Sequence, residues 1–310
     1  MEQVLVGVDL GGTFIKFGIF KENGELLGKW QVPTGERAAQ AVLSKITWEI
    51  VEKSGYAVNQ MKGVGIGIPG AVDGQGMIIN APNLGWRMLD IKEPLLKKLS
   101  IPVQVGNDAN VAALGEQYFG VGGGCSSMVM VTLGTGVGGG VIIDGRLVPG
   151  AFGGGGEIGH IQVNDQETVA CGCGNKGCLE QYASATGIAS LARRELERTD
   201  EASLLRSCTE LTAKDVFDAV KDRDILADRV AEQFGQALAK ALSYIACTVD
   251  PEVFVIGGGV SAAGPVLLNY IEKYYRQFAF TPSKQTPFKL AALGNDAGIY
   301  GAARLVMLNK

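Results

Sequence analysis

Short apolar runs separated by turn residues predict strands along the first part of the chain. Valine, isoleucine and phenylalanine dominate these runs, and glycine-rich or Asn-Gly turns lie between them, which is typical of hairpins and buried strands. The predicted strands are Val4–Asp9, Phe14–Phe20, Glu25–Val32, Gly63–Pro69 and Val103–Gly106. A helix is predicted over Ala38–Lys53, where apolar residues recur at helical spacing, and another over Asp108–Tyr118.

A similar plan begins again at Ser127, where a strand runs into a glycine-rich turn at Gly134–Gly139. The predicted strands of this part are Ser127–Leu133, Gly140–Asp144, Val253–Ile256 and Phe288–Leu293. The predicted helices are Thr186–Leu196, Leu211–Lys221, Leu226–Thr248, Pro265–Phe278 and Ala297–Leu308. Core packing is the best explanation of the apolar stripe along the long helix after Leu226.

This weak repeat predicts two α/β lobes that face one another across a ligand cleft, because the turns Asp9–Thr13 and Leu133–Val137 hold matching places. A chain of 310 residues agrees with roughly two domains. We assign residues 1–120, with the C-terminal helix at about 297–310, to a small N-terminal lobe. Residues 121–296 form the larger lobe, which carries an inserted loop at 157–180.

Composition narrows the class of protein. Apolar residues make up 46% of the chain and charged residues 19%, which suffices for a substantial core. The net charge is −4 and no basic block stands out, which argues against a nucleic-acid surface. No basic segment followed by a long apolar run opens the chain, and no apolar stretch reaches the roughly 18 residues of a membrane span. We therefore expect a cytoplasmic protein.

One histidine and three cysteines predict a metal site. His160, Cys171, Cys173 and Cys178 follow the spacing H-x10-C-x-C-x4-C, and these four side chains are the ligand complement of a closed structural zinc site. Gly172 and Gly177 are expected to let the backbone turn tightly between the sulfurs. Buried free thiols beside a core histidine are the alternative, which fits the scattered Cys125, Cys208 and Cys247 better. The expected task of the metal is to fix Glu157 and Glu180, which bracket the ligands.

Glycine clusters mark places where backbone can approach a ligand closely, and 45 of 310 residues are glycine. The turn Asp9–Thr13 (DLGGT) offers backbone N–H groups for phosphate oxygens and a carboxylate for Mg²⁺, directly or through water. Gly134–Gly136 can form a second phosphate loop. Gly257–Gly259 lies between a strand and a helix and can receive a flat ligand. A tight hairpin is the alternative for the first turn, and helix–strand packing for the last.

Asn107 and Asp108 follow a buried strand and open a helix. A carboxylate in this place is most often an N-cap, and that interpretation of Asp108 is the more common one. The functional alternative is that Asp108 accepts a proton from an attacking hydroxyl while Asn107 orients the same substrate. The segments Pro69–Gly70 and Asn80–Trp86 can line the same cleft, or be simple loops.

Together these motifs resemble the ROK family of bacterial sugar kinases and regulators. That resemblance implies the two-lobed actin-like, hexokinase-type ATPase fold, built from duplicated RNase H-like domains. It covers nearly the whole chain, and the pair GEIGH at 156–160 and CGCGNKGCLE at 171–180 is its most specific part. The other segments that carry it are DLGGT at 9–13, IPG at 68–70, NLGW at 83–86, NDAN at 107–110, LGTGVGGG at 133–140, GGGVS at 257–261 and LGNDAG at 293–298.

The resemblance implies an ATP-dependent hexose kinase that phosphorylates the 6-hydroxyl of glucose, with Asp108 as general base. ATP, Mg²⁺ and a structural Zn²⁺ are the implied cofactors, and a homodimer is the implied assembly. The implied sugar-binding residues are Gly70, Asn83, Asn107, Asp108, Glu157, His160 and Glu180. The implied nucleotide- and Mg²⁺-binding residues are Asp9, Gly11, Gly12, Thr13, Lys16, Gly134, Thr135, Gly136, Gly257, Gly258 and Gly259.

N-acetylmannosamine kinase and fructokinase activities stay open, because the sequence does not rank closely related sugars. A sugar-sensing regulator without catalysis is the alternative from another class. Regulators of this family carry a DNA-binding domain ahead of the sugar domain, whereas the first predicted strand here begins by Val4. The acidic net charge also argues against DNA binding.

Overall fold

The computed structural model describes residues 3–308, which form two compact units. Unit 1 contains the described residues up to Gly124, the segment Gly140–Gly156 and the residues from Ala292 onward. Unit 2 contains Cys125–Gly139 and Glu157–Ala291. Residues 140–156, predicted to belong to the larger lobe, cluster with unit 1 instead. Among the described residues, no helix is both long and apolar enough to cross a membrane.

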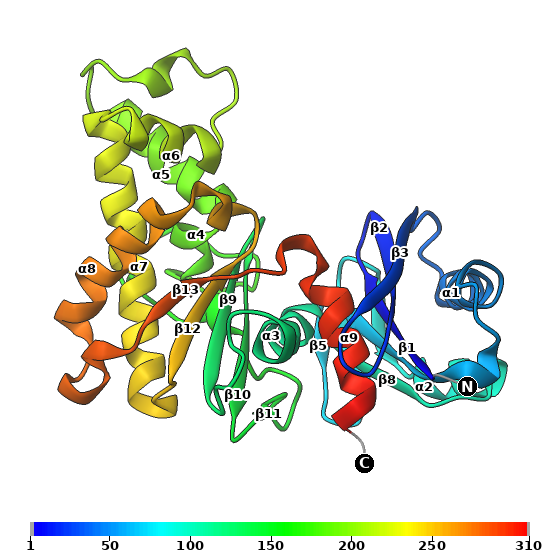
Figure 1. Ribbon diagram of the computed structural model, residues 1–310. Helices are drawn as coiled ribbons and strands as arrows, with labels where there is room; N and C mark the ends of the chain where they lie inside the picture. Colours follow the sequence, from blue (N-terminus) through cyan, green and yellow to red (C-terminus); the bar gives the residue numbers. More distant parts are fainter. Residues whose placement is uncertain (1–2, 309–310) are drawn as a thin grey trace. The chain divides into compact units, whose positions relative to one another are not determined.

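A five-stranded sheet in the order β3-β2-β1-β4-β8 forms the centre of unit 1 (Figure 1). Strand β1 pairs antiparallel with β2 and parallel with β4. The inner strands β1 and β4 are buried along almost their whole length, as near-continuous apolar runs require. The bounds are β1 (Val4–Leu10), β2 (Phe14–Phe20), β3 (Leu26–Pro33), β4 (Met61–Ile68) and β8 (Val103–Asn107).

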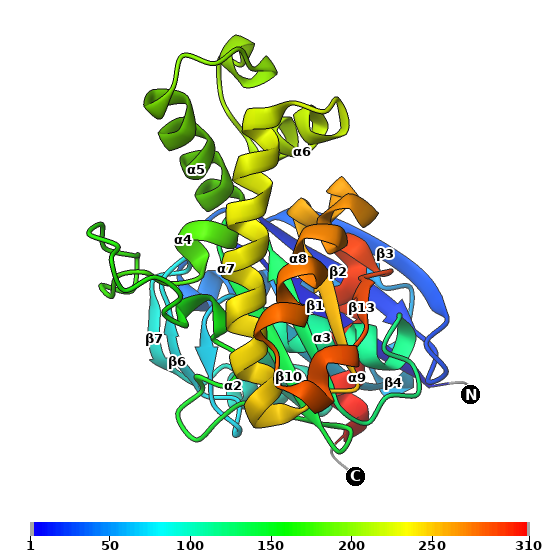
Figure 2. The ribbon, with the colours of Figure 1, turned by 90° about the vertical axis from the view of Figure 1, so that its left-hand side faces the viewer.

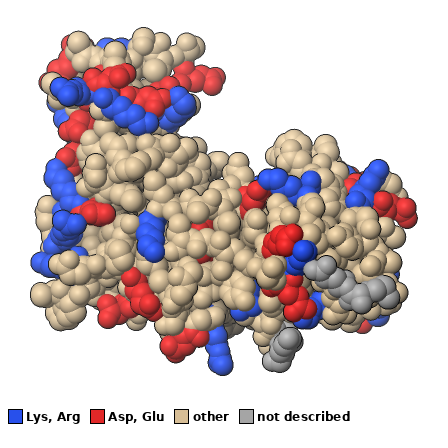
Figure 3. All heavy atoms as spheres, viewed as in Figure 1, with Lys and Arg blue, Asp and Glu red and all other residues tan. Residues whose placement is uncertain are grey.

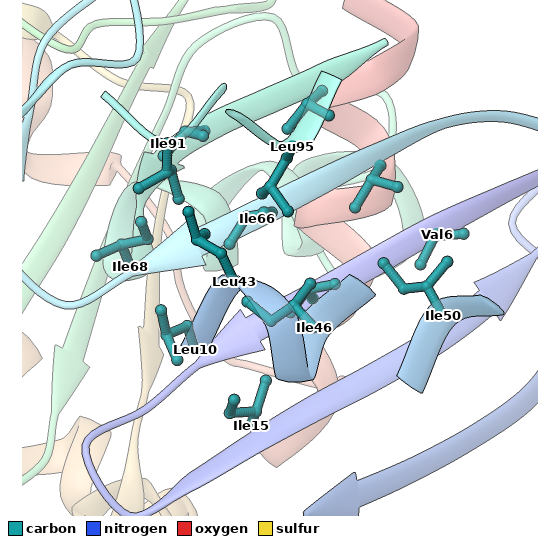
Figure 4. Packing of buried hydrophobic residues seen from close by; sticks show 14 of the residues in the cluster. Val6, Leu10, Ile15, Leu43, Ile46, Ile50, Ile66, Ile68, Ile91 and Leu95 are labelled. Atoms are coloured by element: carbon teal, nitrogen blue, oxygen red, sulfur yellow. The ribbon is translucent and has the colours of Figure 1, made fainter. Parts of the chain in front are cut away.

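Helices cover both faces of this sheet. Figure 4 shows Leu43, Ile46 and Ile50 of α1 directed toward sheet residues within one apolar cluster. A second cluster joins residues of β1 and β2 to α9. A side chain at Gly65 in β4 would collide with the backbone of Ala302 in α9, so glycine permits this close contact. The helices are α1 (Ala39–Lys53), α2 (Lys92–Leu99), α3 (Asp108–Phe119) and α9 (Ala297–Leu308).

A buried carboxylate organises the end of α3. Glu116 is fully buried and accepts hydrogen bonds from the backbone N–H groups of Val121 (3.1 Å) and Leu293 (2.7 Å). Val121 lies just before the chain first leaves unit 1, and Leu293 lies just after its last return to unit 1. One side chain thus fixes both segments within unit 1.

A small antiparallel sheet follows β4, in a region where no strand was predicted and where Asn80–Trp86 was expected to line the cleft or to be a simple loop. It consists of β5 (Ala71–Val72), β6 (Ile78–Ala81) and β7 (Trp86–Leu89). The interpretation of Asn80–Trp86 as a simple loop is therefore wrong, since its ends belong to β6 and β7. Strands of two to four residues are too short to show a period in the sequence.

The second sheet repeats the strand order of the first, as β11-β10-β9-β12-β13. Strands β9, β10 and β11 take the places of β1, β2 and β3, while β12 and β13 take those of β4 and β8. The α/β duplication predicted from the sequence is confirmed by this order. Strand β10 passes from unit 2 into unit 1 at Gly140. The bounds are β9 (Met128–Leu133), β10 (Val137–Ile143), β11 (Arg146–Leu147), β12 (Val253–Gly257) and β13 (Phe288–Leu290).

Two strand predictions in this sheet need correction. The turn after β9 is shorter than expected, because a hydrogen bond from Gly134 N to Gly136 O (2.9 Å) closes it and the strand resumes at Val137. Strand β13 ends at Leu290, before the end predicted at Leu293. Both errors lie beside glycine-containing turns. There the apolar pattern does not show which residues pair with a neighbouring strand, so it does not fix the end of the strand.

Helix α7 (Ile225–Val249) is the longest helix described in unit 2, and α8 packs beside it (Figure 2). Its apolar stripe, including Val230, Phe234 and Leu238, is fully buried, so the core-packing interpretation is confirmed. The other helices are α4 (Glu180–Ala183), α5 (Ala185–Arg198), α6 (Ala213–Lys221) and α8 (Pro265–Phe278). The short 3-10 turns are Val58–Gln60, Ile158–His160, Leu204–Ser207, Gly259–Ala263, Thr281–Gln285 and Gly294–Asp296.

Acidic and basic side chains mix over the α5–α6 end of unit 2, at the top of Figure 3. Ion pairs account for much of this mixture, for example Lys214 with Asp218 and Arg229 with Glu201. Exposed pairs of this kind contribute little stability each, so this face is best understood as a solvated surface.

Candidate active site and metal centre

The four predicted zinc ligands lie together in unit 2. Their ligand atoms all fall within 4.8 Å of one another. The sulfurs of Cys173 and Cys178 are 3.7 Å apart, and Cys171 Sγ lies 3.9 Å from His160 Nδ1. Four tetrahedral ligands at ordinary zinc bond lengths lie about 3.5–3.8 Å apart. The donor set and its spacing therefore fit a closed zinc site made of His160, Cys171, Cys173 and Cys178.

A compact loop brings these ligands together. Cys171 N donates to Asn175 O (2.7 Å) and Gly174 N to Cys171 O (2.9 Å), which closes a turn between the sulfurs. Gly174 and Gly177 have φ values of +90° and +72°, which favour glycine. Gly172 has no such φ value, so the expectation that Gly172 permits the turn is wrong, and Gly174 does so instead.

The thiols respond to their surroundings in different ways. Burial raises the pKa of Cys178 to about 12 and also raises that of Cys171 above its ordinary value. The pKa of Cys173 is lowered, mainly by a hydrogen bond from the backbone of Asn175. Metal ligation requires deprotonated thiols, so binding of a cation at the buried Cys171 and Cys178 would be coupled to the release of protons.

Glu180 joins the metal loop to the second glycine turn. It begins α4, two residues after Cys178, and its Oε1 lies 3.7 Å from Cys171 Sγ. Its Oε2 accepts a hydrogen bond from Val137 N (3.0 Å). A side chain at Gly136 would collide with the same oxygen. Sequence reasoning missed the role of Val137, because its contribution is a backbone N–H that no side-chain pattern reveals.

A buried carboxylate fastens the metal loop to the helices of unit 2. Glu167 Oε2 accepts hydrogen bonds from Tyr182 Oη (2.7 Å) and Arg194 Nη1 (3.0 Å), and Oε1 accepts from Val169 N (3.0 Å). Burial raises the pKa of Glu167, but the hydrogen bonds from Val169, Tyr182 and Arg194 outweigh it and lower the pKa to about 2. Glu167 is therefore ionised at neutral pH, and nothing in the sequence pattern indicated this role.

A cavity of about 500 Å³ brings together two of the predicted glycine motifs. Gly134 and Thr135 line it with Gly259, so the predicted second phosphate loop and the motif predicted to receive a flat ligand share one pocket in unit 2. Helix α6, predicted as Leu211–Lys221, forms another wall of the cavity. This role was not predicted, because the charged face of α6 resembles that of any solvated helix. The remaining lining residues are Ala185, Thr212, Ala213, Lys214, Phe217, Asp218, Lys221, Val260, Ala262 and Ala263.

The first two glycines of the Gly257–Gly259 motif serve packing. A side chain at Gly257 would lie 2.8 Å from Met130 Cε. Gly258 has a φ of +82°, and a side chain there would meet the backbone of Leu133. A side chain at Gly259 would meet no atom within 4 Å. The structure thus places Gly259 alone of the three in the cavity wall.

In unit 1, the turn Asp9–Thr13 is a tight hairpin. Gly11 N donates to Phe14 O (2.9 Å), so this N–H group serves the turn itself. Gly12 faces a more open region, in which a side chain would come near Asn83 at 3.9 Å. Lys16 Nζ lies 3.2 Å from Asp9 Oδ2 and 3.0 Å from Asn295 O. The hairpin interpretation and a ligand role are compatible, because the N–H group of Gly11 closes the hairpin and a ligand would use other N–H groups of the turn.

Asn107 and Asp108 divide the tasks at the start of α3. Asn107 is the N-cap, because its Oδ1 accepts from Asn110 N (2.9 Å), and its Nδ2 donates to Gly70 O (2.9 Å). The interpretation of Asp108 as the cap is therefore wrong, since strand β8 continues through Asn107. Asp108 is the first helical residue, half-buried, and its Oδ1 accepts from Ala109 N (2.8 Å).

The predicted sugar-binding residues come from both units. Gly70, Asn83, Asn107 and Asp108 belong to unit 1. Glu157, His160 and Glu180 belong to unit 2, where Glu157 and His160 are exposed. Glu157 precedes a short 3-10 turn, and His160 is the last residue of that turn. Within unit 1 the structure joins Asn107 to Gly70, and within unit 2 it joins Glu180 and His160 to the metal loop.

Comparison with known proteins identifies the family. The model of the ROK family matches residues 5–308. A glucokinase of Halalkalibacterium halodurans is 40% identical, with 97% of this chain and 94% of the relative covered. A glucokinase of Thermotoga maritima is 36% identical, with 97% and 96% covered. The chain belongs to the ROK family, as its motifs predicted.

A solved structure agrees in fold along the whole chain. The crystal structure of a ROK family glucokinase from Streptomyces griseus, in complex with glucose and AMPPNP, matches with a TM-score of 0.81. The two chains are 34% identical, and the match covers 99% of this chain and 100% of the other. The predicted two-lobed α/β fold is confirmed.

Proposed function

We propose that this protein is an ATP-dependent glucokinase that transfers the γ-phosphoryl group of ATP to the 6-hydroxyl of glucose. The observation that carries the proposal is the cavity in unit 2 where Gly134 and Thr135 meet Gly259. This cavity supports the proposal because the predicted phosphate loop at Gly134–Gly136 borders a space of about 500 Å³, in a chain similar along its length to glucokinases. The glucose and AMPPNP in the Streptomyces griseus structure support both substrates.

The nucleotide is bound by backbone and small residues in this proposal. The adenosine lies in the cavity between α6 and Gly259, and its phosphates extend toward Gly134–Gly136. Asp9 holds Mg²⁺ directly or through water, with Gly12, Thr13 and Lys16 near the phosphates. A bound Mg²⁺ supplies neutralisation of the polyphosphate charge, which phosphoryl transfer needs more than covalent help.

The acceptor hydroxyl is activated by Asp108. Because Asn107 caps α3, the Asp108 carboxylate is not required for capping, and it can take the proton of the 6-hydroxyl. Asn107 stays aligned through its hydrogen bond to Gly70 and binds the same sugar. Asn83, Glu157, His160 and Glu180 hydrogen-bond the other hydroxyls.

Zinc has a structural task in this proposal. Four protein ligands leave no open coordination position for a reacting group. The closed loop keeps Glu180 on the backbone of Val137 and keeps the ring of His160 in one orientation. Substrate-binding residues are thereby held in place before the sugar arrives.

We also infer a homodimer, as the family resemblance implies, which light scattering coupled to size-exclusion chromatography would test. The cytoplasm is the proposed compartment, because the reaction consumes ATP.

A coupled ADP-release assay with Mg-ATP over a sugar panel tests the function. The panel contains glucose, mannose, fructose, N-acetylglucosamine and N-acetylmannosamine, and glucose is expected to have the highest kcat/KM. Asp108→Asn is expected to lower kcat on the order of 10²–10⁴-fold while glucose still binds. Asp200→Asn, at an exposed carboxylate of unit 2, is the matched control.

Each result separates one part of the proposal. Normal turnover of Asp108→Asn would overturn the general-base role. Preference for an N-acetylated sugar or fructose would keep the mechanism and change the substrate. Sugar binding without turnover by the wild-type protein would favour a sensor.

A further inference from the structure

Phe152 is the most exposed large apolar side chain among the described residues, at 88% exposure. It lies in the segment Pro149–Gly156 of unit 1, between β11 and Glu157. A single exposed apolar side chain is common on protein surfaces, so the exposure of Phe152 makes its ring available to a ligand and does not by itself indicate one.

The segment around Phe152 is tightly held. Gly155 N donates to Pro149 O (2.9 Å), which closes a loop with Phe152 at its tip. Gly150 and Gly153 have φ values of +78° and +74°, which shape the two sides of the tip. Gly153 is buried, and a side chain there would come within 3.0 Å of the backbone of Val72 in β5. The ring is therefore presented from a loop that packs on the small sheet.

Two contacts tie this loop to the surroundings of Asp108. Asn110, two residues after Asp108, is 2% exposed, and its Nδ2 donates to Gly155 O (3.3 Å). On the other side, β5 follows Gly70, whose carbonyl accepts from Asn107 Nδ2. Asn110 Oδ1 is buried and finds no donor among the described residues. A buried acceptor of this kind is expected where a polar ligand or water completes the site.

We propose that Phe152 is a specificity-determining residue of the acceptor site, whose ring packs against a C–H face of the hexose. This inference rests on the proposed function. All ring hydroxyls of β-glucose are equatorial, so both faces of its ring present C–H groups, which suit the negative face of an aromatic ring. An axial hydroxyl, at C4 in galactose or C2 in mannose, places a polar group on one face. Phe152 offers that group no hydrogen bond, so the axial epimer loses affinity.

Asn110 acts through the loop and is a positioning residue. Its hydrogen bond to Gly155 holds the loop that carries Phe152. Asn110 lies two residues after Asp108, so this hydrogen bond connects the loop to the start of α3. Selectivity for glucose over its epimers thus depends on unit 1, where the reacting hydroxyl is activated.

The test compares Phe152→Ala with Phe280→Ala, a control at another exposed phenylalanine, which lies in unit 2 and is 64% exposed. Phe152→Ala is expected to raise the KM for glucose roughly five- to tenfold, with kcat within about twofold of wild type. The ratio of kcat/KM for glucose over galactose and mannose is expected to fall by a similar factor. Phe152→Tyr should restore both values, and the KM for ATP should not change.

Binding is measured as well, by calorimetry with glucose, galactose and mannose, so that the inference is tested independently of turnover. If wild type binds glucose but does not phosphorylate it, the proposed function fails, while the binding ratios still report on Phe152. Unchanged sugar affinities and ratios in Phe152→Ala would overturn the inference. So would a change from dimer to monomer with unchanged ratios, which would assign the ring to an interface between copies.

Discussion

Replacing Glu167 with glutamine removes the charge that fastens the metal loop to helices α4 and α5 of unit 2. The side chain of Glu167 is only 6% exposed, and it accepts hydrogen bonds from Tyr182, Arg194 and the backbone of Val169. Glutamine keeps the shape but presents one amide nitrogen where a carboxylate oxygen accepted hydrogen bonds. The variant should therefore loosen the loop that carries Cys171, Cys173 and Cys178.

The lowered pKa of Glu167 sets the magnitude and the pH window. Its pKa falls from 4.5 to about 2 on folding. A difference of roughly 2.5 units corresponds to about 3 kcal/mol, and screening at the half-exposed Arg194 reduces this to about 2–3 kcal/mol. Because the folded pKa is the lower one, this stabilisation is complete above about pH 4.5 and is lost as the pH falls toward 2.

Urea unfolding at about pH 7, 5 and 3 measures this difference between wild type and Glu167→Gln. The variant should be less stable by about 2–3 kcal/mol at neutral pH, and less than about half of that deficit should remain near pH 3. Acid effects on the cysteines act on both proteins and cancel in the comparison. Glu197→Gln, at an exposed carboxylate of α5, is the control and should change little. A deficit that does not shrink on acidification would refute the argument from charge.

Two further substitutions test the link between metal loop and substrate residues. Cys173→Ser removes one ligand, so elemental analysis should find little zinc in this variant. Its KM for glucose should rise about tenfold, because Glu180 loses the support of the metal loop. Full zinc occupancy would contradict the ligand assignment. Gly136→Ala places a methyl group against Glu180 Oε2, so the carboxylate must move, and glucose affinity measured by calorimetry should fall about tenfold. Gly28→Ala is the control for Gly136→Ala, because a side chain at Gly28 meets nothing within 4 Å. Equal glucose affinity of the two variants would exclude the displacement of Glu180.

Elements with a clear period were predictable from the sequence, and elements defined by their partners were not. The helices Pro265–Phe278 and Ala297–Leu308 have the predicted bounds, because apolar positions repeat over several turns in each. Strands β5 to β7 escaped prediction, since strands this short depend on each other for their hydrogen bonds. The N-cap was misplaced by one residue, because Asn107 and Asp108 are both good caps and only the end of β8 decides between them.

The site shows the same division. The metal ligands were found because three cysteines fall within eight residues, so local chain geometry brings their sulfurs together. The contact of Glu180 with Val137 N spans 43 residues and depends on the strand order of the second sheet. The wall that α6 adds to the cavity beside Gly134 and Gly259 likewise has no sequence signal, because Lys214 and Asp218 there also form an ordinary surface ion pair.

The glycine clusters in the sequence predicted the location of a cavity, but they did not predict which glycines line it. The clusters at Gly134–Gly136 and Gly257–Gly259 did mark a cavity, yet of their glycines only Gly134 and Gly259 line it. Gly136 makes room for a carboxylate and Gly258 for backbone. Isolated glycines such as Gly65 instead let α9 lie directly on the first sheet. A glycine cluster therefore indicates where backbone must come close, and only the structure distinguishes closeness to a ligand from closeness to another part of the chain.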